Sequence, residues 1–119
     1  MLIVADNLPS DIGLRIKEIT KLKMELKKTE AYQQAMRENK PRLFSEVILT
    51  PEEVRGHPPI LLDLVTDAVI LYDKGVLREE LEKVRRRLQE LGARKVTIPG
   101  KGWYWILKPN AKLGEVIKI

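Results

Sequence analysis

MLIVADNLPSDIGLRIKEI, residues 1–19, decides the start of the fold, because it runs from an apolar stretch through a turn into a helix. The residues from Met1 to Ala5 are all apolar. A short apolar run ended by a turn signal predicts a strand that is buried on both faces of a sheet. Strands of this kind lie in the middle of sheets, so the run predicts that a further element of the sheet precedes Met1.

A long amphipathic helix is predicted after the turn at residues 6–9. Ser10 or Asp11 can cap its start by accepting hydrogen bonds from the first free N–H groups. Apolar residues then recur at helical spacing, with lysines and glutamates between them. The spacing predicts a helix to about Glu38 with a break near Thr29. The apolar positions of this stripe are Ile12, Ile16, Ile19 and Leu22 or Leu26.

The rest of the chain alternates between strand and helix patterns. Strands are predicted at residues 43–49 and 68–72, and a hairpin at residues 96–98 and 103–107. Helices are predicted after Thr50-Pro51, over an apolar stripe at residues 60–65, and at residues 77–91 with Gly92 as the stop. No linker divides the chain. We therefore expect one domain over residues 1–119, of α/β (α+β) class, with a mixed sheet and flanking helices.

Composition excludes several classes of site. With no cysteine and one histidine, the chain has no disulfide, no thiolate metal site and no multi-histidine zinc site. Its 33% of charged residues, rich in Lys, Arg and Glu, are typical of a thermophile's surface. The net charge of +5 permits contact with nucleic acid or nucleotides. Without a signal peptide or a membrane-length apolar run, the chain is expected to be cytoplasmic.

A basic cluster and an aromatic hairpin are the candidate binding surfaces. Arg85, Arg86 and Arg87 are consecutive, so they point around a helix, and nearby glutamates compete with phosphate for them. Trp103 and Tyr104 fall on opposite faces of a predicted strand, where they can stack on a base or a partner, or pack in the core. Lys101, in the turn of the same hairpin, joins them as a candidate.

Three further polar residues are weak candidates for chemistry. His57 is the only imidazole base, but without an acid partner nearby in the sequence it is expected to cap a helix or face solvent. Asp63 and Asp67 lie four residues apart on one helix face. They can hold a metal ion there, but a solvated helix face is the better explanation of the pair.

The second half of the chain contains four distinctive sequence motifs, and together these motifs resemble those of a known family. HPPILLDLVTDAVILYDKG (57–75), LGARKV (91–96), GKGWYWILKP (100–109) and GEVIKI (114–119) follow one another. In this order they resemble archaeal minimal nucleotidyltransferases of the DNA polymerase β superfamily. There a proline-led helix runs into a VILYD strand, and a Trp-rich hairpin precedes a GEVI tail. Members also have a strand similar to LIVAD, preceded by a Gly-Ser turn and an Asp-x-Asp pair.

The resemblance implies that the second aspartate of that pair falls immediately before Met1. Intact relatives transfer a nucleotide from a nucleoside triphosphate to an acceptor hydroxyl with Mg²⁺, which the paired carboxylates hold. A third carboxylate of the family lies on the next strand. Glu46 is the candidate for it, with a solvated glutamate as the alternative. The chain as given is therefore expected to be a truncated, catalytically incompetent member that binds no cofactor by itself.

The resemblance also implies partners. Minimal nucleotidyltransferases are often paired with a helical HEPN protein, and an unpaired opening strand favours a homo-oligomer. Two alternatives stay open: a non-catalytic interaction module, for instance an antitoxin-like partner of a HEPN protein, and a basic nucleic-acid-binding domain.

Overall fold

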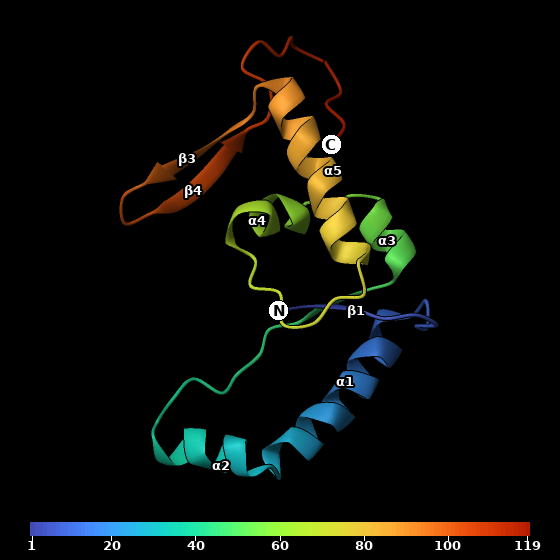
Figure 1. The fold of residues 1–119 in the computed structure, drawn as a ribbon, viewed down its shortest axis with the longest axis vertical. Helices are drawn as coiled ribbons and strands as arrows, with labels where there is room; N and C mark the ends of the chain where they lie inside the picture. Colours follow the sequence, from blue (N-terminus) through green and yellow to red (C-terminus); the bar gives the residue numbers. More distant parts are fainter. The chain divides into compact units, whose positions relative to one another are not determined.

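The computed structural model describes residues 1–119 and has mixed α+β content, as predicted (Figure 1). It contains five helices and two separate two-stranded sheets. The chain divides into two compact units, an N-terminal unit of residues 1–52 and a C-terminal unit of residues 53–119. The boundary falls within the short helix α3, Pro51–Arg55.

The sheet of the N-terminal unit is a parallel pair. Strand β1 (Leu2–Val4) lies beside β2 (Val47–Leu49), with Leu2 level with Val47. Two more hydrogen bonds extend the ladder at its Met1 end. The Met1 amino group donates to the Ser45 carbonyl at 2.7 Å, and the Val47 N–H donates to the Met1 carbonyl at 2.9 Å. These two bonds place Met1 level with Glu46.

This register explains two departures from the sequence pattern. The strand predicted at residues 43–49 forms only at 47–49, because Leu43 and Phe44 lie beyond the residues of β1 that could pair with them. The opening strand is half-buried rather than buried on both faces, and Met1 is exposed. A two-stranded sheet leaves one edge of each strand without a neighbour.

Helix α1 (Ile12–Lys27) begins at Asp11, whose carboxylate accepts from the Leu14 N–H at 3.0 Å. The predicted break near Thr29 is confirmed, since the Thr29 hydroxyl caps the next helix, α2 (Glu30–Arg37). The predicted apolar stripe of α1 does not face a core. Ile12, Ile16 and Leu22 are exposed, because the small sheet covers little of the helix.

The buried side chain of α1 is instead a charged one, Arg15. Its Nε donates to the Pro9 carbonyl at 2.5 Å and one terminal nitrogen donates to the Ile48 carbonyl at 3.1 Å. The guanidinium thus ties α1 both to the turn before it and to β2. Carbonyl oxygens in these positions compensate for removing the charge from water.

The C-terminal unit has its core along α5 (Val76–Leu91), which packs against α4 (Ile60–Asp67). Helix α5 starts where the Asp73 carboxylate accepts from the backbone N–H groups of Leu77 and Arg78, and it ends at Gly92 with φ +67°. Positive φ suits glycine, so the predicted stop is confirmed. The buried apolar residues of the unit are Val54, Leu61, Leu81, Val84 and Leu88.

Residues 68–72, AVILY, are not the buried strand that their composition predicts. They form no strand, and Val69, Leu71 and Tyr72 are 83%, 88% and 79% exposed. High β-propensity is realised only where a neighbouring strand supplies hydrogen bonds and a packed face. No strand of the chain pairs with this segment.

The predicted hairpin is confirmed as β3 (Arg94–Ile98) and β4 (Gly102–Ile106). The strands are antiparallel, with Val96 level with Tyr104. Gly100 and Gly102 have φ of +71° and +107°, which the turn needs and other residues rarely adopt. The hairpin forms its own sheet, so the parallel and antiparallel pairs are not joined in one mixed sheet. None of the helices is long and apolar enough to cross a membrane.

Candidate functional site

Glu46 lies in the N-terminal unit one residue before β2, and its carboxylate is paired with Lys23 of α1. The Lys23 Nζ is 2.7 Å from Glu46 Oε1 and also donates to the Phe44 carbonyl at 3.3 Å. The Glu46 side chain is 12% exposed, and its Oε2 is buried without a hydrogen-bond partner. The carboxylate is therefore turned toward α1 rather than into solvent.

The Glu46 side chain lies on the opposite face of the sheet from the side chains of Ser45 and Val47. Successive residues of a strand point to opposite faces, so Ser45 and Val47 share one face and Glu46 takes the other. The role of Glu46 as a third carboxylate stays a prediction. A metal ion at this carboxylate would have to compete with the ammonium of Lys23.

Asp63 and Asp67 are each held by a residue of the hairpin within the C-terminal unit. The Trp103 indole N–H donates to Asp63 Oδ1 at 2.8 Å, and Lys95 is 2.5 Å from Asp67 Oδ2. The hydrogen bond from Lys95 lowers the pKa of the Asp67 carboxyl below its ordinary value. The two carboxylates thus act as anchors for the hairpin instead of converging on one point.

The residues present do not fit a magnesium site. No group of three or more His, Cys, Asp or Glu side chains lies close enough together to hold a metal ion. The single carboxylates that the sequence suggests are each engaged by a lysine or a tryptophan, as described above.

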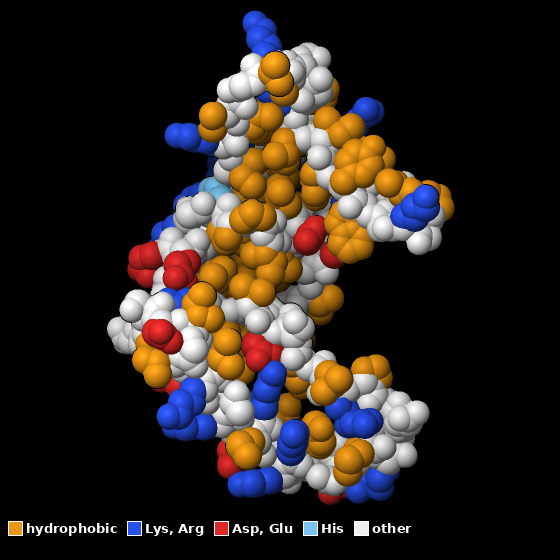
Figure 2. Space-filling view, turned by 180° about the vertical axis from the view of Figure 1, so that it is seen from behind, with side chains coloured by type: hydrophobic (Ala, Val, Ile, Leu, Met, Phe, Trp, Pro, Cys, Tyr) orange, Lys and Arg blue, Asp and Glu red, His pale blue; other side chains and the backbone are white.

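Trp103 and Tyr104 of the hairpin are exposed. Figure 2 shows hydrophobic and basic side chains together over this part of the unit. Lys95 lies over the Trp103 ring, 4.8 Å from its centroid, a cation–π contact that occupies one face of the indole. Trp105 is half-buried, and its Nε1 is buried without a hydrogen-bond partner. Lys101 is exposed in the turn. Of the predicted binding residues, Tyr104 and Lys101 are therefore accessible to a partner. Trp103 is less so, because Lys95 covers one face of its ring and its N–H is bonded to Asp63.

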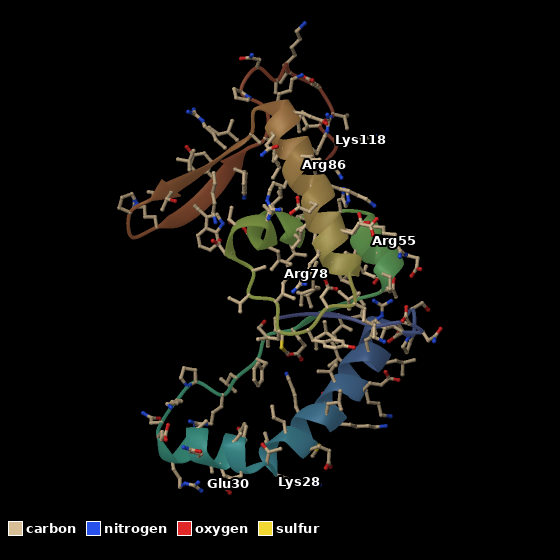
Figure 3. All side chains as sticks on the ribbon, in the orientation of Figure 1. Lys28, Glu30, Arg55, Arg78, Arg86 and Lys118 are labelled. Atoms are coloured by element: carbon tan, nitrogen blue, oxygen red, sulfur yellow. The ribbon has the colours of Figure 1, made fainter.

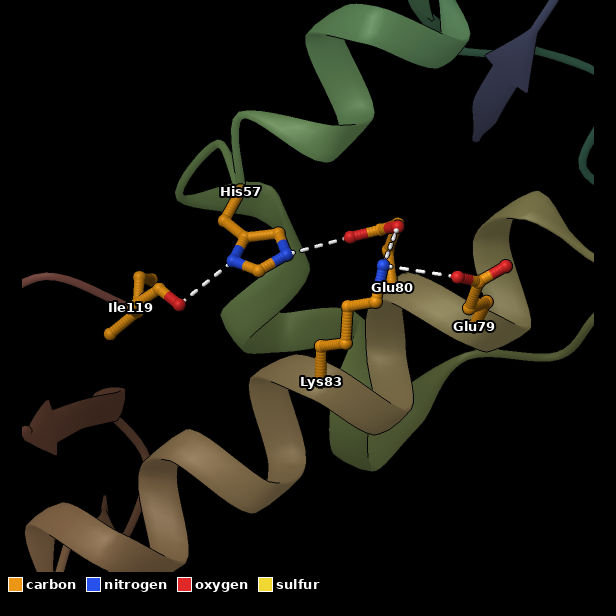
Figure 4. Close-up of polar contacts among 5 residues, drawn as sticks. All are labelled: His57, Glu79, Glu80, Lys83 and Ile119. Carbon is orange, nitrogen blue, oxygen red and sulfur yellow. Dashed lines mark hydrogen bonds and ion pairs between the residues drawn. The ribbon is translucent and has the colours of Figure 1, made fainter.

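His57 neither caps a helix nor faces solvent freely, which corrects the prediction from the sequence. Its Nε2 is 2.8 Å from Glu80 Oε2 and its Nδ1 is 2.8 Å from the main-chain oxygen of Ile119 (Figure 4). Lys83 Nζ lies 2.8 Å from Glu80 and 3.0 Å from Glu79. The pairing of His57 with Glu80 spans 23 residues, and no local signal in the sequence indicates it.

Glu80 is 3% exposed, and opposing effects act on its carboxyl. Burial raises the pKa, while hydrogen bonds from Lys83 and His57 lower it, and the net pKa lies below the ordinary value of 4.5. The same contacts with Glu80 and Glu79 raise the pKa of Lys83. The cluster therefore favours a charged Glu80 inside the fold. Through His57, which lies just before α4, Glu80 of α5 is linked to the main chain of Ile119.

The three consecutive arginines of α5 point to different places. Arg85 pairs with Glu82 and donates to the Val65 carbonyl at 3.2 Å, whereas Arg87 donates to the Lys118 carbonyl at 2.9 Å. Arg86 is exposed on the helix (Figure 3). The cluster is thus a set of separate contacts, with one guanidinium open to solvent, rather than a single phosphate-binding patch.

Comparison with known proteins adds no family to this picture: no protein-family model, no curated protein and no solved structure matches the chain.

Proposed function

We propose that the chain is the portion of a nucleotidyltransferase of the DNA polymerase β superfamily that follows the Asp-x-Asp pair. Intact members of this family move a nucleotide from a nucleoside triphosphate to an acceptor hydroxyl, using Mg²⁺ held by that pair. Residues 1–119 contain neither an Asp-x-Asp nor a Gly-Ser sequence. In this proposal they do not transfer nucleotides by themselves, since two carboxylates and a phosphate cradle are both needed.

The observation that carries the proposal is the parallel pairing of β1 with β2. In the family that the chain resembles, the opening strand lies beside the next strand along the chain, and a helical connection joins the two. β1 and β2 pair in this way, with α1 and α2 between them in the sequence. Parallel neighbours need such a crossover. The motifs in residues 57–119 resemble the same family in sequence, but residues 68–72, a strand in the family, form no strand here.

The geometry favours a structural role for Glu46 within this proposal. An aspartate immediately before Met1 would, if the β1 ladder continued, lie level with Ser45. Its side chain would then point to the face opposite Glu46. We therefore propose that Glu46 holds Lys23 and α1 in place and does not act as the third metal ligand.

Two measurements test this proposal. The codons directly upstream of Met1 are expected to encode an in-frame Gly-Ser and Asp-x-Asp, and a protein extended by them should transfer nucleotide in a Mg²⁺-dependent reaction. Codons that encode neither motif would contradict the family assignment.

In the extended protein, Glu46→Gln should leave the rate within about twofold of the parent, whereas loss of a metal ligand costs far more. A large loss of rate without loss of folding would restore Glu46 as a ligand.

A second candidate function, a non-catalytic interaction module, is favoured by the exposed segment at residues 69–72. Val69, Leu71 and Tyr72 place three large apolar side chains in water, and exposed apolar clusters mark interaction sites. A HEPN-type protein is the partner that the resemblance suggests. Co-expression with such a protein from the same genome should give a stable complex that Val69→Asp with Leu71→Asp disrupts. An unchanged complex would remove this candidate.

A further inference from the structure

The strongest unassigned feature is a cleft within the N-terminal unit, between the second half of α1, the start of α2 and residues 42–44. Its volume is about 290 Å³, near the lower end of the range for small-molecule pockets. A second hollow, formed with residues 39–43, adjoins it and shares Tyr32, Arg42 and Leu43 with it. Lys23 and Phe44, which take part in the Glu46 contact, also line the cleft, and no residue of the hairpin does.

The walls of the cleft are apolar and its charged groups are all basic. Met24, Leu26, Leu43 and Phe44 provide aliphatic and aromatic surface, and Tyr32 closes one side. The charged side chains that line it are Lys23, Lys27 and Arg42, with no carboxylate among the lining residues. Figure 2 shows Lys and Arg side chains lying among hydrophobic ones over the α1–α2 end of the unit.

Two of the three cations are available to a ligand. Lys23 is committed to Glu46 at 2.7 Å. Lys27 has no ion-pair partner, and Arg42 uses one terminal nitrogen to donate to the Lys40 carbonyl at 2.9 Å, which leaves most of its N–H donors unused. A half-buried guanidinium beside apolar walls binds an anion more strongly than a fully solvated one does.

We propose that this cleft binds a small amphipathic anion, with an apolar body between Met24 and Phe44 and an acidic head on Arg42 and Lys27. A cationic ligand of the same shape would meet only like charge, and a neutral one would leave both cations without a partner. A polar body such as a nucleoside would gain little from the aliphatic walls. The chemistry shared by the candidate ligands is one carboxylate, sulfonate or phosphate on an apolar skeleton.

Decanoate is the probe, and decyltrimethylammonium, which has an unbranched apolar chain of nearly the same length and the opposite charge, is its control. Both are titrated into ¹⁵N-labelled protein below the concentration at which they form micelles. Decanoate should shift amide signals of residues 20–44 in a saturable way, and decyltrimethylammonium should bind at least about tenfold more weakly, a difference of about 1.4 kcal/mol. Adenosine monophosphate, an anion with a polar body, should also bind more weakly than decanoate.

Variants then test the head-group contacts. Arg42→Gln and Lys27→Gln should each weaken decanoate binding by about tenfold, the scale of one charge-assisted hydrogen bond. Lys21→Gln is the matched control, since Lys21 is an exposed lysine of α1 that does not line the cleft. Arg42→Lys keeps the charge and should retain most of the affinity. Equal binding of the two detergent-like probes, shifts outside residues 20–44, or unchanged affinity in Arg42→Gln would each overturn the proposal.

Discussion

At the scale of single residues, the polar groups of this chain serve mainly as internal ties. Arg15, Glu46 and Glu80 are each largely withdrawn from water, and each has charged or carbonyl partners from a distant part of its unit. The sequence shows the charges but not these pairings. Periodicity identifies which face a residue is on, whereas a partner more than 20 residues away depends on the tertiary arrangement.

Glu80 makes the stability of the C-terminal unit sensitive to acid. Its pKa in the fold lies below the ordinary value of 4.5, so its stabilising effect is complete above that value and is lost as the pH falls through the lower folded pKa. Glu80→Gln should reduce the free energy of unfolding by about 1–3 kcal/mol at pH 7, and the gap from the parent should narrow as the pH falls below 4.5 and through the lower folded pKa.

Urea denaturation of both proteins from pH 3 to 7 measures this gap. Glu82→Gln is the control on the same helix, because the pair between Glu82 and Arg85 is largely exposed and should contribute less than about 1 kcal/mol. A gap between Glu80→Gln and the parent that stays constant with pH would contradict the account of Glu80.

The two faces of α5 should differ sharply in their tolerance of truncation. Leu88 is 6% exposed and belongs to the core, while Arg86 is exposed. Leu88→Ala should lower the free energy of unfolding by about 2–5 kcal/mol, and Arg86→Ala should change it by less than about 0.5 kcal/mol. Chemical denaturation compares them. Equal effects would show that the helix buries a different face.

At the scale of elements, local signals predicted the helices better than the strands. The break near Thr29, the Pro51 start and the Gly92 stop lie where the sequence places them, because helix starts and stops depend on signals within a few residues. Residues 68–72 look like a strand and form none. A strand depends on a partner elsewhere in the chain, and composition alone cannot supply one.

The hairpin should depend on its tie to α4 through Trp103. Trp103→Phe removes the N–H that donates to Asp63 and should cost about 0.5–1.5 kcal/mol of stability. It should also speed hydrogen exchange of the amides at residues 94–106. Tyr104→Phe, at a neighbouring exposed position, should leave exchange unchanged. If both variants exchange at the same rate, the indole contact does not hold the hairpin.

At the scale of the whole molecule, the class of fold followed from the sequence and the sheet arrangement did not. Alternating strand and helix patterns predicted α+β content, but the strands form two small sheets. The residues of the candidate functional site could be named from the sequence, but the cleft of the N-terminal unit could not. Glu46, Trp103 and Tyr104 are visible in the sequence, while the cleft with Tyr32 and Arg42 arises from how α2 and residues 42–44 fold back beside α1.

Self-association is expected at this scale, because β1 pairs with β2 and has no strand at its other edge. Unpaired N–H and C=O groups on such an edge pair readily with another chain. Light scattering after gel filtration, over a hundredfold range of concentration, should show a dimer or larger species that increases with concentration. A monomer throughout the range would contradict this expectation.

The central proposal is that residues 1–119 are the portion of a nucleotidyltransferase that follows the metal-binding pair. Calorimetric titration with Mg²⁺-ATP tests it most directly, on the 119-residue chain and on the same chain joined to the Gly-Ser and Asp-x-Asp segment of an archaeal family member. The account predicts no measurable binding by the first and Mg²⁺-dependent binding by the second. Tight binding by the 119-residue chain alone, or none by a folded extended protein, would contradict it.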